Sequence, residues 1–264
     1  MKRRAFLKTS SVAGAGVLAG LSGAIAGAAE GQREFYELRV YEMPTGNRKA
    51  LLNDYLAKAA IPAWSRLGIG PVGVFNVVSG SNALMLYALI PYPSLDAFLS
   101  APEKVEADAE YRQAAAAYAA CSIDNPAYTR YESWLLRAFT NVPRLRVPAE
   151  TVEKKPRLFE LRVFESHSEA AARKKIEMFN EGGEIALFDR VGLRSVFFGQ
   201  TLAGPRQPNL VYMTVHADMA AREAVWDTFR NDAGWKKLSA EPAFANTVSA
   251  STVVFLRPTE YSQI

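Results

Sequence analysis

A seven-residue pattern occurs twice in the chain, and this repeat constrains the fold more than any other feature. Residues 36–42 read YELRVYE and residues 159–165 read FELRVFE, so five of the seven positions are identical and the other two exchange Tyr for Phe. At offsets of 124 to 125, residues 61–68 match residues 185–192, and Tyr87 matches Tyr212. A near-constant offset indicates two copies of one structural unit. We therefore expect domain 1 at residues 33–140, a Pro-rich linker at 141–156 and domain 2 at 157–262.

Each copy has the pattern of a small α+β unit. In the first copy, alternation of apolar and polar residues from Tyr36 onward predicts a strand. A helical apolar stripe at 51–59, two β-prone runs at 72–78 and 85–90, a helical stretch at 94–120 and a strand at 131–137 follow. The order βαββαβ is that of a ferredoxin-like sheet with helices on one face. The predicted fold class is therefore α+β, with two tandem ferredoxin-like units.

The first 28 residues have the pattern of an export signal. Arg3 and Arg4 form a twin arginine in a charged segment, a modest apolar stretch follows at 12–25, and residues 26–28 (AGA) form a small-x-small cleavage site. The apolar stretch is short and rich in Gly, which disfavours a membrane anchor. We expect a Tat-type signal, cleavage after Ala28, and a periplasmic or other extracytoplasmic location.

The basic character of the chain comes from this leader. The sequence pI is about 9.1, but the leader holds four of the 31 Lys and Arg residues and no acid. Without it, 27 basic residues face 27 acidic residues. A near-neutral mature chain gives no electrostatic reason to expect nucleic acid as a partner. No later run approaches 18 uninterrupted apolar residues, so we expect no integral membrane segment in the mature chain.

Several repeated residues resemble the NIPSNAP family. The resemblance rests on the ELRVY and ELRVF openings, the Leu/Val-Gly turn, the Asp-x-x-Tyr/Trp late helix and LRPTEYS at residues 256–262. It covers the second copy almost fully, whereas the first copy is more diverged and has Arg137-Ala138 in place of the terminal Arg-Pro-Thr. The resemblance implies a dimeric α/β barrel, in which two ferredoxin-like sheets close face to face. With two copies in one chain we expect the barrel to close within one molecule, and association into a homo-oligomer stays open.

The resemblance implies little about activity, because NIPSNAP members have vesicular, mitochondrial or stress-related roles without an established reaction. Our first hypothesis is a non-catalytic module that binds a small apolar or carboxylated molecule, or a partner. The alternative is a cofactor-independent or haem-assisted oxidoreductase that uses the barrel lumen, since related α/β-barrel families include such enzymes. A structural protein with a filled barrel is the third hypothesis. We predict no catalytic residue and no cofactor, with haem as a minor alternative.

The first strand of each copy supplies the candidate site. If Leu38 and Val40 pack under helices, alternation sends the set Glu37, Arg39 and Tyr41, and likewise Glu160 and Arg162, to the lumen. One interpretation is that these Glu and Arg side chains form structural ion pairs, because buried charges are costly unless paired. The other is a ligand pocket in which Arg39 or Arg162 binds a carboxylate and Glu37 or Glu160 accepts a proton. Aromatic side chains that could line the same cavity are Tyr87, Tyr212, Phe75 and Phe198.

The chain has two histidines, His167 and His216, and both belong to the second copy. We expect them just beyond the carboxyl ends of the first and third strands, which we take as parallel neighbours, so that the two side chains could approach each other. Such a pair could serve a metal or haem, but zinc needs three or four ligands and no cysteine lies near. The favoured interpretation is two surface loop histidines, with a metal role as a weak alternative.

Overall fold

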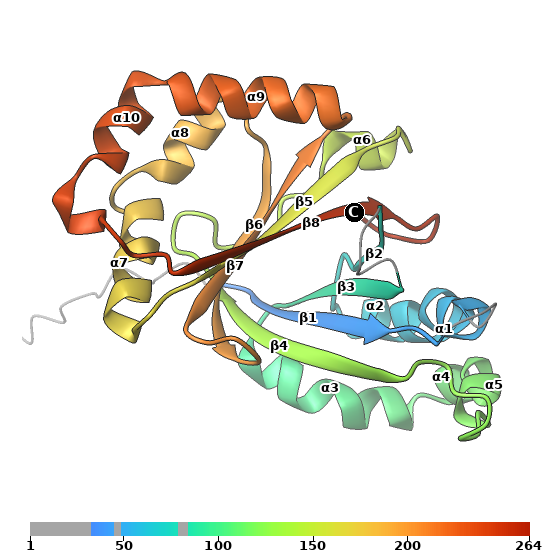
Figure 1. The fold of residues 1–264 in the computed structure, drawn as a ribbon. Helices are drawn as coiled ribbons and strands as arrows, with labels where there is room; N and C mark the ends of the chain where they lie inside the picture. Colours follow the sequence, from blue (N-terminus) through green and yellow to red (C-terminus); the bar gives the residue numbers. More distant parts are fainter. Residues whose placement is uncertain (1–32, 45–48, 79–83) are drawn as a thin grey trace, which may run out of the picture. The chain divides into compact units, whose positions relative to one another are not determined.

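The structure is a computed structural model that describes residues 33–44, 49–78 and 84–264. In these ranges, eight strands form a closed antiparallel barrel in the order β1-β3-β2-β8-β5-β7-β6-β4 (Figure 1). The strands are β1 Phe35–Glu42, β2 Gly73–Val77, β3 Met85–Tyr92, β4 Arg130–Ala138, β5 Leu158–Glu165, β6 Ser195–Ala203, β7 Asn209–His216 and β8 Ala250–Pro258.

The helices lie outside the barrel in two groups, one for each repeat (Figure 1). In the first repeat they are α1 Lys49–Tyr55, the π-helix Leu56–Ala60, α2 Ile61–Arg66, α3 Leu95–Ala107, α4 Ala109–Ala114 and α5 Ala116–Ala119. In the second repeat they are α7 Glu169–Phe179, α8 Glu184–Val191, α9 Met219–Asn231, α10 Ala233–Ser239 and the 3₁₀ turn Pro242–Phe244. The linker at 141–156 carries α6, Ala149–Val152.

The two repeats close one barrel within the chain, as the sequence predicts. Strands β1 to β4 form one ferredoxin-like half and β5 to β8 form the other. The halves join along two seams, where β2 pairs with β8 and β4 pairs with β6. At these seams Arg257 stands opposite Asn76, and Arg137 stands opposite Gln200. The registers of the two halves make the first pair the structural equivalent of the second.

The late helix predicted at 94–120 is broken at Asp108, and its counterpart breaks at Asp232. Each aspartate caps the helix that follows: Asp108 accepts the backbone N–H of Tyr111 at 3.2 Å, and Asp232 accepts that of Trp235 at 3.1 Å. An N-terminal cap of this kind satisfies a backbone donor that the helix leaves free. Arg66 and Arg190, which match in the repeat, pair with Asp108 and Asp232 respectively. The Asp-x-x-aromatic motif is therefore a repeated helix start.

The face assignment of the first strand was wrong. Leu38 and Leu161 point into the lumen, and the charged side chains Glu37 and Glu160 point towards the helices. The reason is that two sheets facing each other across a closed barrel leave an apolar interior. The space between sheet and helices, by contrast, can supply polar partners for a buried charge.

Some expectations concern residues beyond the described ranges. Arg3, Arg4 and the cleavage site after Ala28 lie outside the described residues, so export stays a prediction. The linker is described and is more than a connection, because Val142 is buried against the helices of the second half. No helix in the described part of the chain has the length and apolar character needed to cross a membrane.

Candidate functional site

One end of the barrel lumen is filled by the chain itself. Ile264 is 0% exposed and packs among the luminal side chains. A Cβ placed on Gly73 would lie only 2.6 Å from the Cδ1 atom of Ile264, so the strand here needs a glycine. This plug closes the end at which β2 starts and β8 finishes.

The other end of the lumen holds a pocket of about 230 Å³. Both repeats line it, with equivalent residues from each half facing across it. Its apolar wall consists of Leu38, Val40, Leu161, Val163, Val254, Met85, Tyr87 and Trp134. Strand alternation places these residues here, because β1, β4, β5 and β8 each send every second side chain inwards.

The rim of this lumen pocket is charged, but its two cations have partners. Arg206 donates from Nη1 to Thr252 Oγ1 at 3.1 Å, lies 3.6 Å from Glu165 Oε1, and stacks over the Trp134 ring at 5.0 Å. Arg130 and Glu42 form the second pair, at 3.3 Å between Nε and Oε2. The positive φ of 56° at Arg206 fixes the hairpin that brings its guanidinium over the opening. The pocket therefore presents little unbalanced charge to a ligand.

Tyr87 supplies a polar group inside the pocket. Its side chain is 6% exposed and belongs to the luminal cluster. Burial raises the pKa of Tyr87, and the nearby Arg206 charge opposes this only in part. At neutral pH the phenol is protonated, so it can donate or accept a hydrogen bond at the pocket wall.

The predicted residues of the first repeat form an ion pair under the helices. Arg39 donates from Nε to Glu37 Oε1 at 2.7 Å and from Nη2 to Oε2 at 2.9 Å. The hydroxyls of Tyr92 and Ser133 also donate to this carboxylate, at 3.1 and 2.7 Å. Arg39 reaches Tyr41 OH at 3.3 Å. The predicted ion pair between Glu37 and Arg39 is therefore present, but it lies on the outer face of the sheet and not in the lumen.

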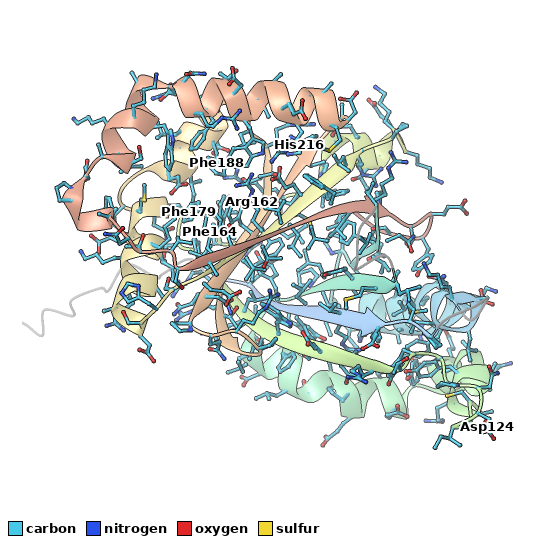
Figure 2. All side chains as sticks on the ribbon, viewed as in Figure 1. Asp124, Arg162, Phe164, Phe179, Phe188 and His216 are labelled. Carbon is cyan, nitrogen blue, oxygen red and sulfur yellow. The ribbon has the colours of Figure 1, made fainter. Side chains whose placement is uncertain are left out.

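The second repeat builds a denser version around Glu160, which is 0% exposed. Arg162 donates to it at 2.7 Å, Arg222 at 2.9 and 3.0 Å, and the Trp226 indole N–H at 2.7 Å. Burial alone would raise the pKa of Glu160, but these donors and the neighbouring His216 outweigh it and hold the pKa well below its usual range. A carboxylate this well bonded is a structural anion and a poor proton acceptor. Figure 2 shows Arg162 and His216 on the side of the barrel that α9 covers.

The two histidines do not meet. Strands β5 and β7 are antiparallel, and His216 pairs with Leu158 at the opposite end of β5 from His167. Eight strand residues separate the two ends by roughly 25 Å. His167 is exposed, but His216 is buried, with Nε2 at 2.9 Å from Thr214 Oγ1 and 3.5 Å from Glu160 Oε2. The expectation of parallel strands was wrong, and the expectation of a surface position holds for His167 but is wrong for His216.

This arrangement does not suit haem. The His216 ring nitrogen is already occupied by protein partners, and neither histidine lines the pockets described here. The described residues also contain no group of three or more His, Cys, Asp or Glu side chains placed to hold a metal ion. Any function through haem would need a mode of binding that these histidines do not provide.

The tyrosine match of the two repeats fails by one residue. Tyr87 pairs with Val40 and faces the lumen, whereas Tyr212 pairs with Arg162 and faces the helices. The structural equivalent of Tyr87 is Val211, at an offset of 124 rather than 125. Phe75 and Phe198 also differ by one position, since the equivalent of Phe75 is Gly199, and so Phe75 lies in the lumen and Phe198 under the helices. A one-residue slip in a strand reverses the face.

Among the residues that line the lumen pocket, sequence analysis had named Tyr87 alone as a site residue. The missed lining residues include Trp134, Glu132 and Arg206. The sequence pattern could have identified Trp134, because it alternates with Leu136 along the strand and both side chains are luminal. Arg206 carries no sequence signal, since its place over the pocket depends on a hairpin from the opposite half of the barrel.

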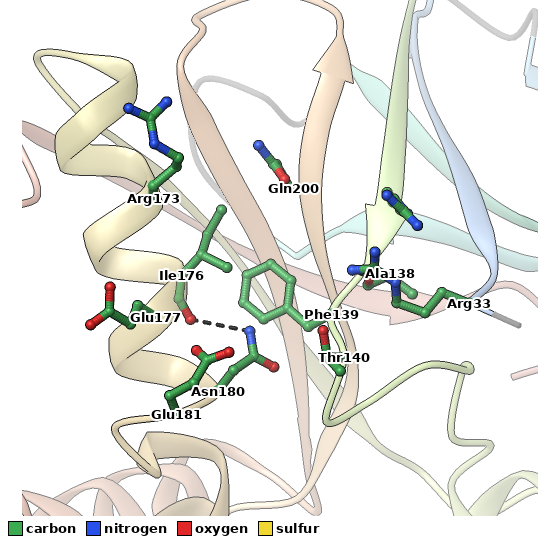
Figure 3. Close-up of a pocket in the computed structure, with 11 residues that line it drawn as sticks. Arg33, Ala138, Phe139, Thr140, Arg173, Ile176, Glu177, Asn180, Glu181 and Gln200 are labelled. Carbon is green, nitrogen blue, oxygen red and sulfur yellow. Dashed lines mark hydrogen bonds between the residues drawn. The ribbon is translucent and has the colours of Figure 1, made fainter. Parts of the chain in front are cut away.

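Two further hollows lie on the outside of the barrel, one near each seam. The hollow near β4 and β6 has a volume of about 450 Å³. Figure 3 shows Arg173 and Glu177 of α7 on one side of it, and Gln200 and Arg33 on the other. The side chain of Asn180 closes its floor by donating to Ile176 O at 3.1 Å. The hollow near β2 and β8 is larger, at about 650 Å³.

Fold and site together define an intramolecular α/β barrel with a ligand-sized lumen pocket. The NIPSNAP family matches residues 36–125 and 159–263, and the chain belongs to this family. No curated protein matches the sequence.

Solved structures share the fold at low identity. A protein from Lactobacillus acidophilus NCFM, named as a candidate monooxygenase, superposes with a TM-score of 0.56 at 10% identity, covering 86% of this chain and 94% of that one. A similarly named protein from Fusobacterium nucleatum gives a TM-score of 0.53 at 10% identity, covering 86% and 92%. An anthrone oxidase-like protein gives 0.50 at 10% identity, covering 87% and 93%. Identities this low show the fold alone.

Proposed function

We propose that this protein binds one small, mainly apolar molecule in the lumen pocket and does so without chemistry. The observation that carries the proposal is the pocket of about 230 Å³ at the one luminal end that Ile264 does not fill. A dry apolar cavity of about 150 Å³ already accepts benzene. The pocket therefore suits a single substituted ring or a short branched chain, and the Tyr87 hydroxyl favours a ligand with one neutral polar group.

The charges of the site support binding over catalysis. The two glutamates that sequence analysis offered as proton acceptors point away from the lumen and are held by arginines. At the pocket rim, Arg130 and Arg206 are paired with carboxylates. A general base must lie within hydrogen-bond reach of the ligand and hold a free lone pair. On the rim, Glu132 accepts the Trp134 indole N–H at 3.3 Å and Glu42 pairs with Arg130, so both carboxylates already have protein partners.

The alternative is an oxidoreductase that uses the same pocket. It is favoured by three structural neighbours that span most of the chain and are named as candidate monooxygenases or as anthrone oxidase-like. Both functions place the small molecule against Tyr87 and Trp134, and they differ in whether the molecule is changed. Oxygen uptake in the presence of an electron-rich phenol separates them.

We also propose that the mature chain acts outside the cytoplasm. The support is the twin arginine Arg3-Arg4 followed by a short Gly-rich apolar stretch. Substituting both arginines by lysine and fractionating cells tests this point. Full-length protein retained in the cytoplasm supports Tat export, and normal cleavage and release of the variant would refute it.

The binding proposal is tested with p-cresol as the probe, and titration calorimetry on the mature chain measures its affinity. Val254 lines the pocket, whereas the next residue, Val253, is 41% exposed on the outer face of β8. Val254→Phe fills the pocket and should abolish binding, and Val253→Phe is the matched control that should leave it intact. Tyr87→Phe should weaken binding about fivefold, the value of one hydrogen bond. Equal p-cresol affinity in all four proteins would refute the proposal, and oxygen consumption would favour the enzyme.

A further inference from the structure

The larger outer hollow, at the seam of β2 and β8, has an unusual origin. One wall comes from the linker between the repeats, through Thr151, Lys154, Lys155, Pro156 and Arg157. The opposite wall comes from the end of β8 and the segment after it, residues 257–260 and 262, and the turn before α9 closes the third side at residues 217–219. These segments meet because β5, which follows the linker directly, pairs with both β7 and β8. Val78, just after β2, is the lining residue that the first half contributes. With about 650 Å³, this seam pocket is within the usual range for small-molecule sites.

Positive charge dominates the seam pocket. Four cations line it, Lys154, Lys155, Arg157 and Arg257, against two acids. One of these acids, Asp218, is occupied as the cap of α9, where it accepts the Ala221 N–H at 2.8 Å.

Two of the four cations stand free. Arg257 points outwards because its neighbours on β8, Val254 and Leu256, are luminal. Across the described residues, neither Arg257 nor Lys154 has an ion-pair partner. This contrasts with the lumen pocket, whose two arginines are both paired. A pocket with uncompensated cations suits an anionic ligand.

Two buried polar atoms in the linker wall lack a partner. They are Arg157 Nε and Thr151 Oγ1, neither of which has a hydrogen bond within the described structure. Arg157 itself is held in place, donating from Nη1 to Lys155 O and from Nη2 to Ile264 O, both at 3.0 Å. Buried polar groups in folded proteins are nearly always satisfied, by protein, water or ligand. The anchored Arg157 guanidinium is therefore a fixed positive charge in this wall.

Most of the remaining lining is apolar, and Thr259 and Ser262 add two hydroxyl groups. The apolar residues are Val78, Pro156, Leu158, Ala217, Met219 and Pro258. We infer that the seam pocket binds an apolar molecule that carries a carboxylate, with the apolar body along this surface and the anionic head at Arg257 and Lys154. Guanidinium groups bind carboxylates through paired, charge-assisted hydrogen bonds. The inference concerns a second site, separate from the lumen pocket, and stands whether or not the lumen binds a ligand.

The other seam offers a matched control. Arg137 occupies the position equivalent to Arg257, opposite Gln200 as Arg257 is opposite Asn76. The hollow at Arg137 takes no residue of the linker after Thr140. Arg137→Met therefore makes the same chemical change at the same strand position without touching the seam pocket.

The experiment titrates sodium decanoate, below its micelle concentration, into the mature chain and into three variants. Arg257→Met should weaken binding by about tenfold, the loss of one charge-assisted contact. Arg137→Met and the lumen variant Val254→Phe should bind decanoate like the parent protein, with one molecule per chain. Decanol should bind far more weakly than decanoate, and decyl phosphate tells a carboxylate preference from a general anion preference.

Several results would overturn the inference. Equal loss in Arg137→Met and Arg257→Met would show non-specific charge attraction. Loss in Val254→Phe with none in Arg257→Met would move the decanoate to the lumen. Equal affinity for decanol and decanoate would show that the cations do not contribute to binding. Tighter binding of decyl phosphate than of decanoate would show that the site prefers a phosphate to a carboxylate. Arg257 is exposed and unpaired, so the fold of its variant should hold, and circular dichroism checks this.

Discussion

Arg162 decides between the two interpretations that the sequence left open. In the structure its guanidinium bonds to the buried carboxylate of Glu160 and lies 3.9 Å from the centre of the Trp226 ring. Arg162→Met keeps a side chain of similar length and removes the charge. If the arginine has a structural role, stability should fall while binding of p-cresol in the lumen is unchanged.

The size of the loss follows from what remains around Glu160. Breaking a buried ion pair typically costs about 3–5 kcal/mol, because it leaves an unpaired charge. Here Arg222 and the Trp226 indole still donate to the carboxylate. We therefore expect a smaller loss of about 2–3 kcal/mol, the value of a hydrogen bond to a charged group plus part of the cation–π contact. For a chain of this size that lowers Tm by roughly 5–10 °C.

The loss should depend on pH with a defined sign. In the parent protein the folded pKa of Glu160 is depressed, so its contribution to stability is fully present above the unfolded pKa of about 4.3 and is lost as pH falls towards the folded value. Removing Arg162 raises the folded pKa and shrinks that contribution. The difference between parent and variant is therefore largest near pH 7 and should narrow progressively below about pH 5.

Urea unfolding of both proteins between pH 7 and pH 3 measures this difference. Arg230→Met is the matched control, because Arg230 makes an exposed pair with Asp227 on α9 at 3.4 Å. The loss of stability in Arg230→Met should stay within about 0.5 kcal/mol. An Arg162→Met loss no larger than that of the control, or a loss that does not change with pH, would refute the structural role. A loss of p-cresol binding in Arg162→Met would instead support a role for Arg162 in ligand binding.

Two further predictions concern the core. Gly199→Ala should cost about 1–3 kcal/mol by overpacking, because a Cβ there would lie 2.9 Å from the Leu136 Cβ across the β4–β6 seam; an unchanged midpoint of urea unfolding would contradict this contact. Lys175→Met should cost about 3–5 kcal/mol at pH 7, because it strands the buried Glu184 carboxylate that lies 2.8 Å from Lys175 Nζ. Burial already raises the pKa of Glu184, so this deficit should shrink as acid protonates the carboxyl, and a deficit that grows on acidification would exclude the explanation.

Repeat and element order predicted two ferredoxin-like units, and the resemblance to the NIPSNAP family implied that they form a barrel. The pattern at Tyr36 recurs at Phe159, and each recurrence begins a βαββαβ unit whose sheet has an apolar face that must be covered. Two such units in one chain can cover each other, which gives the closed order of eight strands. A local signal was missed at Asp108, whose side-chain carboxylate caps the helix that follows and so breaks the helix predicted at 94–120.

The sequence could not assign faces, because both faces of these strands are buried. Alternation separates Leu38 from Glu37, but it does not say which of the two lies under the helices. That depends on partners from elsewhere, such as Trp226 of α9, whose indole N–H meets Glu160. The lumen pocket depends in the same way on Arg206, which reaches it from the hairpin between β6 and β7. Such contacts are tertiary, so a single-strand pattern does not contain them.

Fusion of two repeats explains why the two seams differ. A barrel made of two identical chains would have identical seams and a lumen with exact two-fold symmetry. Here Phe75 and Tyr87 fill luminal positions where the second half has Gly199 and Val211, and the linker wall with Arg157 stands at one seam only. Because each half evolves in the presence of a fixed partner, a substitution in one needs no matching substitution in the other. As a consequence, Arg257 lies beside the linker, whereas its equivalent Arg137 lies away from it. This difference between the seams predicts one carboxylate site per chain rather than two.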